Sequence, residues 1–410
     1  MSSSAGLREH RAAYLGIVGT TLLVLAVVLG LGLSPHPGSS GSSGSPGGAT
    51  SSERSGVPAA AEAPTAAEAP GAPGADLPQV GHVFVVNIEN KGFGTTWGAH
   101  SRAPYLAKTL RAKGILLKGY YATAHHSLPN YLAQISGQGP NPTMQADCQT
   151  FSNFDQTGTT APQQAQGSGC VFPKGVRSLP TQMSRNHLSW KGYMEDLPRP
   201  CYHPKVGSQD PTQKATAKSQ YATRHNPFVY FHSIINRHTY CKRHVVGLGH
   251  LKKDLGSARH TPALAYITPD LCSDGHDENC ADGRPGGLKS VNAWMKVWVP
   301  RILQSPAFKT NGLLIITADE SDSPQSDSTA CCDETAVNTP QAGIVGPGGG
   351  LIGALLISPY ITPDTWSTTP YNHYSLLGSL AEIYGLKKIG YARTVPDVFG
   401  LDVYNSGWNE

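Results

Sequence analysis

The sequence predicts an α/β fold, a three-layer α/β/α sandwich around a mostly parallel central sheet. Four apolar runs, at residues 80–88, 263–268, 312–317 and 353–358, are continuous rather than alternating, as in strands buried on both faces. Helix-like stretches separate these runs, and polar or acidic side chains follow three of them directly. Because open α/β sheets bind ligands beyond the carboxyl ends of their strands, we expect a functional site there.

The N-terminal region predicts a membrane segment. Residues 14–33 carry no charge and are rich in Leu, Val and Gly. This segment has about the length that a helix needs to span a membrane. Arginines precede this segment at positions 8 and 11, and no charged residue follows before Glu53, so residues 1–13 should be cytoplasmic and the rest exported. We expect an uncleaved anchor; a cleaved signal segment, which would release a secreted protein, is the alternative.

Residues 34–76 are a low-complexity stretch of Ser, Gly, Pro and Ala. Such a composition cannot bury enough apolar surface to fold, so we interpret it as a disordered linker. Residues 77–410 then form one catalytic-sized domain. The chain has 32 basic and 28 acidic residues, and no long block of Lys or Arg, so no nucleic-acid partner is expected. No feature of the sequence indicates the oligomeric state.

Eight cysteines are spread through the domain without the paired CxxC spacing of a zinc site. Together with the predicted export, they indicate disulfide bonds in an oxidising compartment. Local pairing of Cys148 with Cys170 and of Cys201 with Cys241 is expected. The adjacent Cys331 and Cys332 are expected to reach different partners.

Two motifs in the first half of the domain are candidates for chemistry. Glu89 and Asn90 follow the first strand and offer two hard oxygen ligands to a metal ion, although a polar strand exit would have the same composition. Ser127 follows two histidines and precedes a helix-like run with Pro129 in its first turn. Its hydroxyl is a candidate nucleophile at a helix N-terminus, where an anion is favoured; the alternative is a simple helix cap.

The second half adds acidic and histidine side chains at corresponding positions. His225 lies among aromatic residues, where a buried structural histidine is the alternative to a site residue. The apolar run at 263–268 leads into a loop with Asp270, Asp274, His276 and Asp277.

Two further positions complete this set. The apolar run at 312–317 leads to the adjacent carboxylates of Asp319 and Glu320, which repel each other unless a cation or proton lies between them. His373 begins a helix that is expected to end near Gly385.

Six motifs in this order resemble the bacterial phosphoesterase family that includes phospholipases C and secreted acid phosphatases, within the alkaline phosphatase-like superfamily. They span residues 88–93, 126–131, 225–231, 269–277, 317–322 and 373–377. One departure is Ala318, where the family often has a tryptophan, which should alter the wall of the site.

The resemblance implies an alkaline phosphatase-like fold and a divalent metal ion, either Mg²⁺, Ca²⁺, Mn²⁺ or Zn²⁺. Metal activation would make a serine hydroxyl an effective nucleophile, and a histidine would protonate the leaving group. We assign the metal ligands as Glu89, Asn90, Asp319 and Glu320, the catalytic residues as Ser127, His276, His373 and His126, and the substrate-binding residues as His225, Asp274 and Asn130.

The predicted function is that of an exported, metal-dependent phosphomonoesterase that acts through a phosphoserine intermediate. Phosphoinositides or other small phosphate esters are the expected substrates. A phospholipase C-type phosphodiesterase is the alternative, but the chain ends soon after its last motif, which favours the acid phosphatase branch. A non-catalytic binding module on the same scaffold would lack a nucleophile or a metal ligand, and this sequence has both.

Overall fold

A central sheet of eight strands organises the computed structural model, which describes residues 78–332 and 336–404. The order across the sheet is β11, β2, β10, β9, β1, β8, β6 and β7. In chain order, the strands of this sheet are β1 (His82–Ile88), β2 (Ile115–Leu117), β6 (Trp190–Met194), β7 (Val245–Gly247), β8 (Leu264–Thr268), β9 (Gly312–Ala318), β10 (Ala354–Ile357) and β11 (Thr365–Ser367).

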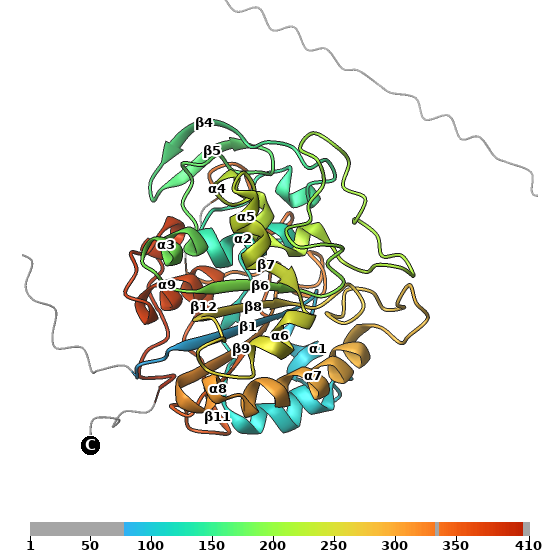
Figure 1. The fold of residues 1–410 in the computed structure, drawn as a ribbon, viewed down its shortest axis with the longest axis vertical. Helices are drawn as coiled ribbons and strands as arrows, with labels where there is room; N and C mark the ends of the chain where they lie inside the picture. The colour runs from blue at the N-terminus through green and yellow to red at the C-terminus, as the bar shows by residue number, and fades with distance from the viewer. Residues whose placement is uncertain (1–77, 333–335, 405–410) are drawn as a thin grey trace, which may run out of the picture. The chain divides into compact units, whose positions relative to one another are not determined.

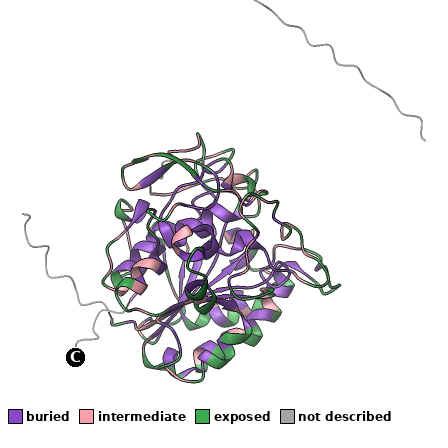
Figure 2. Ribbon diagram, turned by 45° about the horizontal axis from the view of Figure 1, so that its top comes forward, coloured by how far each residue is buried: buried purple, intermediate pink, exposed green. Residues whose placement is uncertain are grey.

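The predicted mostly parallel sheet is confirmed. The antiparallel strand is β10, which pairs in that sense with both β9 and β2. The other pairings in the sheet are parallel. The four apolar runs expected to be strands became β1, β8, β9 and β10, and their residues are almost all buried. Figure 2 shows this buried centre, with exposed residues on the outer helices and loops.

Helices cover the sheet on two sides, which completes three layers. Figure 1 shows α2, α3 and α5 on one side and α7 and α8 on the other. The helices are α1 (Phe93–Trp97), α2 (Ser127–Ser136), α3 (Leu179–Arg185), α4 (His232–Ile235), α5 (His238–His244), α6 (Gly249–Asp254), α7 (Gly287–Gln304), α8 (Pro306–Asn311) and α9 (His373–Ile383).

Two regions differ in detail from the expected elements. The helix-like stretch between β1 and β2 is broken after α1, and it resumes as a π-helix (Tyr105–Leu110) and a 3₁₀ turn (Arg111–Lys113). Pro104 begins that second part, since proline suits a first turn but interrupts a helix interior. Between α2 and α3 the chain forms a hairpin of β4 (Asp155–Thr160) and β5 (Gln164–Ser168). A short pair, β3 (Tyr120–Tyr121) and β12 (Tyr371–Asn372), lies beside the main sheet.

The disulfides confirm part of the cysteine prediction. Cys148 pairs with Cys170 and Cys201 with Cys241, as expected. Another disulfide joins Cys272 to Cys280. The expectation that Cys331 and Cys332 reach different partners was wrong, because the other six cysteines pair among themselves and the two neighbours bond to each other.

The predicted cytoplasmic segment 1–13, membrane segment 14–33 and linker 34–76 lie outside the described residues. Across residues 78–332 and 336–404, no helix has both the length and the apolar character needed to span a bilayer.

Candidate active site

The site begins where the parallel strands β1 and β9 end. Their register pairs Ile88 with Ala318, so the residues that follow, Glu89 and Asp319, leave the sheet side by side. The backbone N–H of Asn90 donates to Oδ1 of Asp319 at 2.9 Å. This register therefore brings the two predicted pairs of metal ligands, which are separated by more than two hundred residues in sequence, to one edge of the sheet.

Ser127 is the first residue of α2 and is buried against Glu89. Its hydroxyl donates to Oε2 of Glu89 at 2.9 Å. One turn later in α2, the hydroxyl of Tyr131 donates to the other oxygen, Oε1. The side chain of Ser127 does not cap the helix; instead, Oδ1 of Asp147 accepts a hydrogen bond from the N–H of Leu128 at 3.0 Å. Because the Ser127 hydroxyl does not cap its own helix, it can bond to the Glu89 carboxylate.

His225 connects Glu89 to a second carboxylate. Its Nε2 lies 3.3 Å from Oε2 of Glu89, and its Nδ1 lies 3.1 Å from Oδ2 of Asp274. The ring stacks on Tyr131 with 5.3 Å between centroids, and all four side chains are buried. Ligand atoms of Glu89, His225 and Asp274 lie within 4.8 Å of one another, a spacing that a metal ion could bridge. The fold thus brings His225 and Asp274, which were predicted to bind substrate, next to Glu89, which was predicted to bind the metal ion.

The buried carboxylates raise one another's pKa values. Burial raises the pKa of Glu89 well above its usual range, and the charges of Asp319 and Asp274 raise it further. Burial also raises the pKa values of Asp319, Asp274 and Glu320. Buried carboxylates this close need protons or a cation.

Two buried oxygens at the same strand ends fit a cation. Oδ2 of Asp319 and Oδ1 of Asn90 have no hydrogen-bond partner among the described residues. A buried oxygen without a partner is costly, whereas hard divalent cations take carboxylate and amide oxygens as ligands. The donor set therefore fits the divalent metal ion expected from the sequence.

Glu320, the fourth predicted metal ligand, contacts a histidine that the sequence reasoning did not select. Its Oε2 shares a hydrogen bond with Nδ1 of His125, and Nε2 of the same ring lies 2.9 Å from the carbonyl oxygen of Asp327. Burial lowers the pKa of His125. Both ring nitrogens are engaged, so His125 holds Glu320 in place beside Asp319.

Asp147 and Arg224 form a polar group next to Ser127. The guanidinium of Arg224 is buried, with Nη2 3.0 Å from Nε2 of His276 and Nε 3.7 Å from Oδ2 of Asp147. Nδ1 of His126 lies 3.6 Å from the same Asp147 oxygen, and this carboxylate raises the pKa of His126. The side chain of His126 is 49 % exposed, so it offers a proton donor on the solvent side of the nucleophile.

His276 is held between groups of its own loop and Arg224. Its backbone N–H donates to Oδ1 of Asp274 at 2.8 Å, and its Nδ1 lies 2.7 Å from Oδ1 of Asp277. The loop after β8 therefore orients His276 and places it in the same hydrogen-bonded group as Asp274.

His373 and Asn130 lie at the site but are occupied by protein contacts. Nε2 of His373 is 2.7 Å from the carbonyl oxygen of Asp319, its Nδ1 is 3.1 Å from the Tyr120 hydroxyl, and burial lowers its pKa to about 4. The amide of Asn130 bonds to the backbone of Ala124 and to other groups of the 123–126 segment. In this conformation both residues hold the backbone around the nucleophile.

Several site residues were missed by the sequence reasoning. Tyr131 is the last residue of one of the six motifs, and Arg224 and His125 each lie directly before a motif. Their positions in the sequence were therefore a signal for these three residues. Asp147 has no local signal, because it lies in a polar stretch and reaches α2 only through the fold, beside the Cys148 disulfide.

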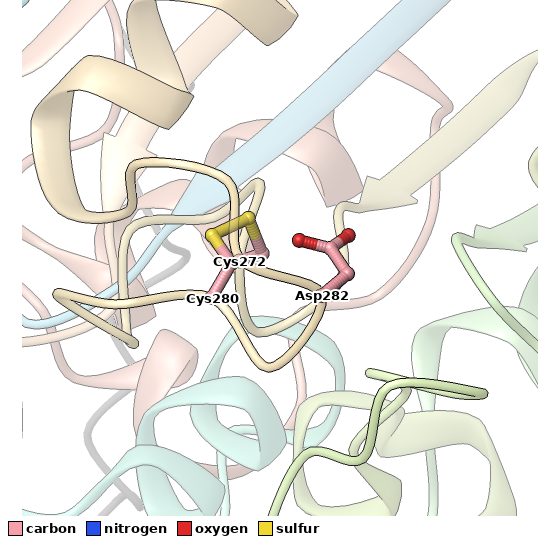
Figure 3. A group of neighbouring side chains, drawn as sticks. All are labelled: Cys272, Cys280 and Asp282. Atoms are coloured by element: carbon pink, nitrogen blue, oxygen red, sulfur yellow. A yellow bond between two sulfur atoms is a disulfide. The ribbon is translucent and has the colours of Figure 1, made fainter. Parts of the chain in front are cut away.

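A second cluster of potential ligands does not form a metal site. Cys272, Cys280 and Asp282 lie close together, but Figure 3 shows the two sulfur atoms bonded to each other. A disulfide sulfur has no thiolate to offer to a metal. The carboxylate of Asp282 accepts instead from the Arg284 side chain at 2.8 Å.

The chain is similar in sequence to known phosphatases. The model of the phosphoesterase family matches residues 89–387. An acid phosphatase of Aspergillus fumigatus is 26% identical over 283 residues, which are 69% of this chain and 51% of that protein. A phosphatidylinositol-3-phosphatase of Mycobacterium tuberculosis is 26% identical over 322 residues, 78% of this chain and 83% of that protein. The chain spans about half the length of the Aspergillus fumigatus enzyme.

Among solved structures, a protein of the alkaline phosphatase superfamily from Vibrio parahaemolyticus has a TM-score of 0.44 and 12% identity. The match covers 81% of this chain and 73% of that chain.

Proposed function

The chain belongs to the phosphoesterase family, and from this premise we propose that it hydrolyses phosphate monoesters through a phosphoserine formed on Ser127. The observation that carries the proposal is the contact of the Ser127 hydroxyl with Glu89, at the start of a helix and beside buried carboxylates. A helix N-terminus favours a phosphate, and a nearby group that accepts the hydroxyl proton favours attack on phosphorus.

Glu89, Asn90, Asp319 and Glu320 are the proposed ligands of a divalent metal ion, and their oxygen donors are compatible with Mg²⁺, Ca²⁺, Mn²⁺ or Zn²⁺. When bound, such an ion lowers the pKa of a contacting hydroxyl and offsets charge on the phosphate oxygens. His225 and Asp274 lie beside Glu89. Their short distances to Glu89 and to each other support the proposal.

The protein residues divide the remaining tasks in the proposed reaction. Attack by Ser127 Oγ forms an O–P bond, breaks the bond to the alcohol and passes the hydroxyl proton toward Glu89. Arg224 has the charge and the planar donors to orient a phosphate, and His126 or His276 protonates the departing alkoxide. Water then cleaves the phosphoserine and releases inorganic phosphate. His373 positions Asp319 through its backbone carbonyl.

Export and lipid substrates are part of the same proposal. The disulfides of the described residues favour an oxidising compartment outside the cytoplasm. The predicted membrane segment at residues 14–33 would direct the export of the domain to that compartment. The activity named for the Mycobacterium tuberculosis relative makes phosphoinositides a substrate class to test. Residues 77–410 are proposed as the catalytic domain, anchored by that segment or secreted after its cleavage.

A parallel assay of the full chain tests this function. Its substrates are p-nitrophenyl phosphate, phosphatidylinositol 3-phosphate and phosphatidylcholine, each with and without a chelator. We expect metal-dependent release of inorganic phosphate from at least one of the two monoesters. Release of diacylglycerol and phosphocholine from phosphatidylcholine would instead establish the phospholipase C alternative, and no turnover of any substrate would contradict both.

A further inference from the structure

A basic recess lies at the amino ends of β6 and β8. It has a volume of about 570 Å³, and its walls come from the end of α3, the start of β6, helix α5 and the loop before β8. Because β1, β8 and β6 are parallel, these amino ends lie at the opposite edge of the sheet from Glu89, which follows the carboxyl end of β1. The basic recess is therefore separate from the candidate active site. Its basic side chains are Lys191, Arg237, Arg243 and Arg259, with the histidines His187, His244 and His260.

Three arginines of the basic recess have no carboxylate partner among the described residues. None of its lining residues is Asp or Glu. Lys191 is paired with Asp254 at 2.6 Å, but no ion pair within the described residues reaches Arg237, Arg243 or Arg259. These three arginines are exposed. An anion from solution can therefore reach guanidinium groups that have no carboxylate partner.

A rigid aromatic wall backs these cations. The His244 ring stacks on Trp190 at 4.6 Å and lies 4.3 Å from the Tyr240 ring. The guanidinium of Arg237 sits over Tyr240 at 4.1 Å. A disulfide from Cys241 fixes α5, the helix that carries Tyr240 and His244. Arg237 is thereby held in place, and a preorganised cation loses less conformational freedom when it binds an anion.

Stabilisation of α5 explains only part of this cluster. Basic residues at the last turn of α5 stabilise the negative end of the helix dipole, and this accounts for Lys242, Arg243 and His244. It does not account for Arg259 and His260, which come from the loop before β8 and face the same recess. Between residues 237 and 260 the chain has six Lys or Arg against one Asp, and folding gathers part of this excess at one concave surface.

We propose that the basic recess is a binding site for a phosphate-bearing anion, either a free phosphate or the phosphate of a lipid headgroup. Arginine guanidinium groups bind phosphate oxygens in pairs of parallel hydrogen bonds. Burial lowers the pKa of His244, and the positive charges of Arg243 and Lys191 lower it further. A bound anion would offset those charges. This inference does not depend on the reaction proposed for Ser127.

The test compares two double variants of the full chain with the wild type. Arg243→Gln/Arg259→Gln removes two exposed cations from the basic recess. Lys108→Gln/Lys113→Gln removes the same charge from exposed residues next to β2. In the strand order, β2 lies near the end of the sheet opposite to β6. Equilibrium dialysis with radioactive inorganic phosphate counts the sites on each protein, and p-nitrophenyl phosphate turnover monitors the active site.

We expect the arginine variant to bind one phosphate fewer per chain than the wild type and the lysine control, with turnover unchanged in all three. The second probe is phosphatidylcholine vesicles with and without phosphatidic acid; a loss of roughly 30-fold in association with the acidic vesicles, confined to the arginine variant, identifies a lipid headgroup as the source. The proposal is overturned if neither probe separates the arginine variant from the lysine control, or if turnover falls together with phosphate binding.

Discussion

The hydroxyl of Ser127 donates a hydrogen bond to Oε2 of Glu89 over 2.9 Å, across 38 residues of sequence. Residues four apart share one face of a helix, so Tyr131 meets the second oxygen of the same carboxylate. Glu89 therefore receives both donors from α2, and the orientation of the proposed nucleophile depends on how this helix packs against the end of β1.

Replacing Ser127 with Ala should lower p-nitrophenyl phosphate turnover by roughly three orders of magnitude or more, because the variant lacks the hydroxyl proposed to attack phosphorus. The fold should persist, since the change removes one hydrogen bond worth about 1 kcal/mol. Ser136→Ala is the matched control in the same helix, where the hydroxyl donates to the Leu132 carbonyl and accepts from the Gln138 N–H, away from Glu89. Normal turnover by the Ser127 variant, with Ser136→Ala also active, would rule out the phosphoserine.

Asp319→Asn should abolish both turnover and the response to metal. The variant keeps an acceptor for the Asn90 N–H but loses the negative charge. A divalent ion at a hundred times its Kd should stabilise the wild type by about 2.7 kcal/mol and raise its Tm, whereas the variant should show no shift. Asp322→Asn is the control, since this exposed carboxylate bonds to Gly92 and Thr95 instead. Equal Tm shifts in wild type and Asp319→Asn would remove Asp319 from the ligand set.

Arg224→Gln should weaken phosphate binding more than it slows the chemical step. Its guanidinium links His276 and Asp147, and a neutral amide cannot pair with a phosphate charge. We expect KM and the inhibition constant for inorganic phosphate to rise about 10- to 100-fold, as for the loss of one charge-assisted contact. Arg185→Gln, at an exposed arginine in α3, should leave both unchanged. A change in kcat alone would contradict a role in phosphate binding.

The stability of the domain should fall between pH 4.5 and pH 7 because of Glu195. Partial burial, and then the charge of Asp270, raise the pKa of Glu195 to about 7 in the folded protein. The folded state then binds this proton more tightly than the unfolded chain, so the contribution is full below about pH 4.5 and is lost as the pH rises through about 7.

The contribution of Glu195 to stability should be on the order of 3 kcal/mol, because each unit of difference between the folded and unfolded pKa values is worth about 1.4 kcal/mol. Glu195→Gln should flatten this part of the Tm profile measured by calorimetry from pH 4.5 to 8. An identical slope in the variant would show that another group titrates there.

The disulfides predict a simple thiol count. The described residues contain no free cysteine, and Cys331 bonds to its neighbour Cys332. Denatured, unreduced protein should therefore show no reactive thiol, and reduction should expose all eight cysteines. Peptide mapping should find Cys331 and Cys332 in one peptide that is not linked to any other. A cross-link from either residue to a distant peptide would contradict the vicinal bond.

Sequence alone determined the central strands of the sheet and most of the candidate site residues. The continuous apolar runs that became β1, β8 and β9 are local patterns, and so are the polar residues that follow each of them. Parallel strands deliver such residues to one edge of a sheet, so the positions of Glu89, Asp274 and Asp319 along the chain were enough to group them. The start of α9 at His373 was likewise predicted from a local helical stripe.

Only the tertiary structure decided which of these groups touch. It joined Glu89 to Ser127 and His225, turned His373 and Asn130 toward the backbone, and brought Asp147 to the start of α2. It also assembled the basic recess from segments without a basic block. The direction, burial and contacts of a side chain depend on strand register and on how loops close over long sequence separations. Strand register and loop closure produce no periodic pattern in the local sequence, so they could not be predicted from it.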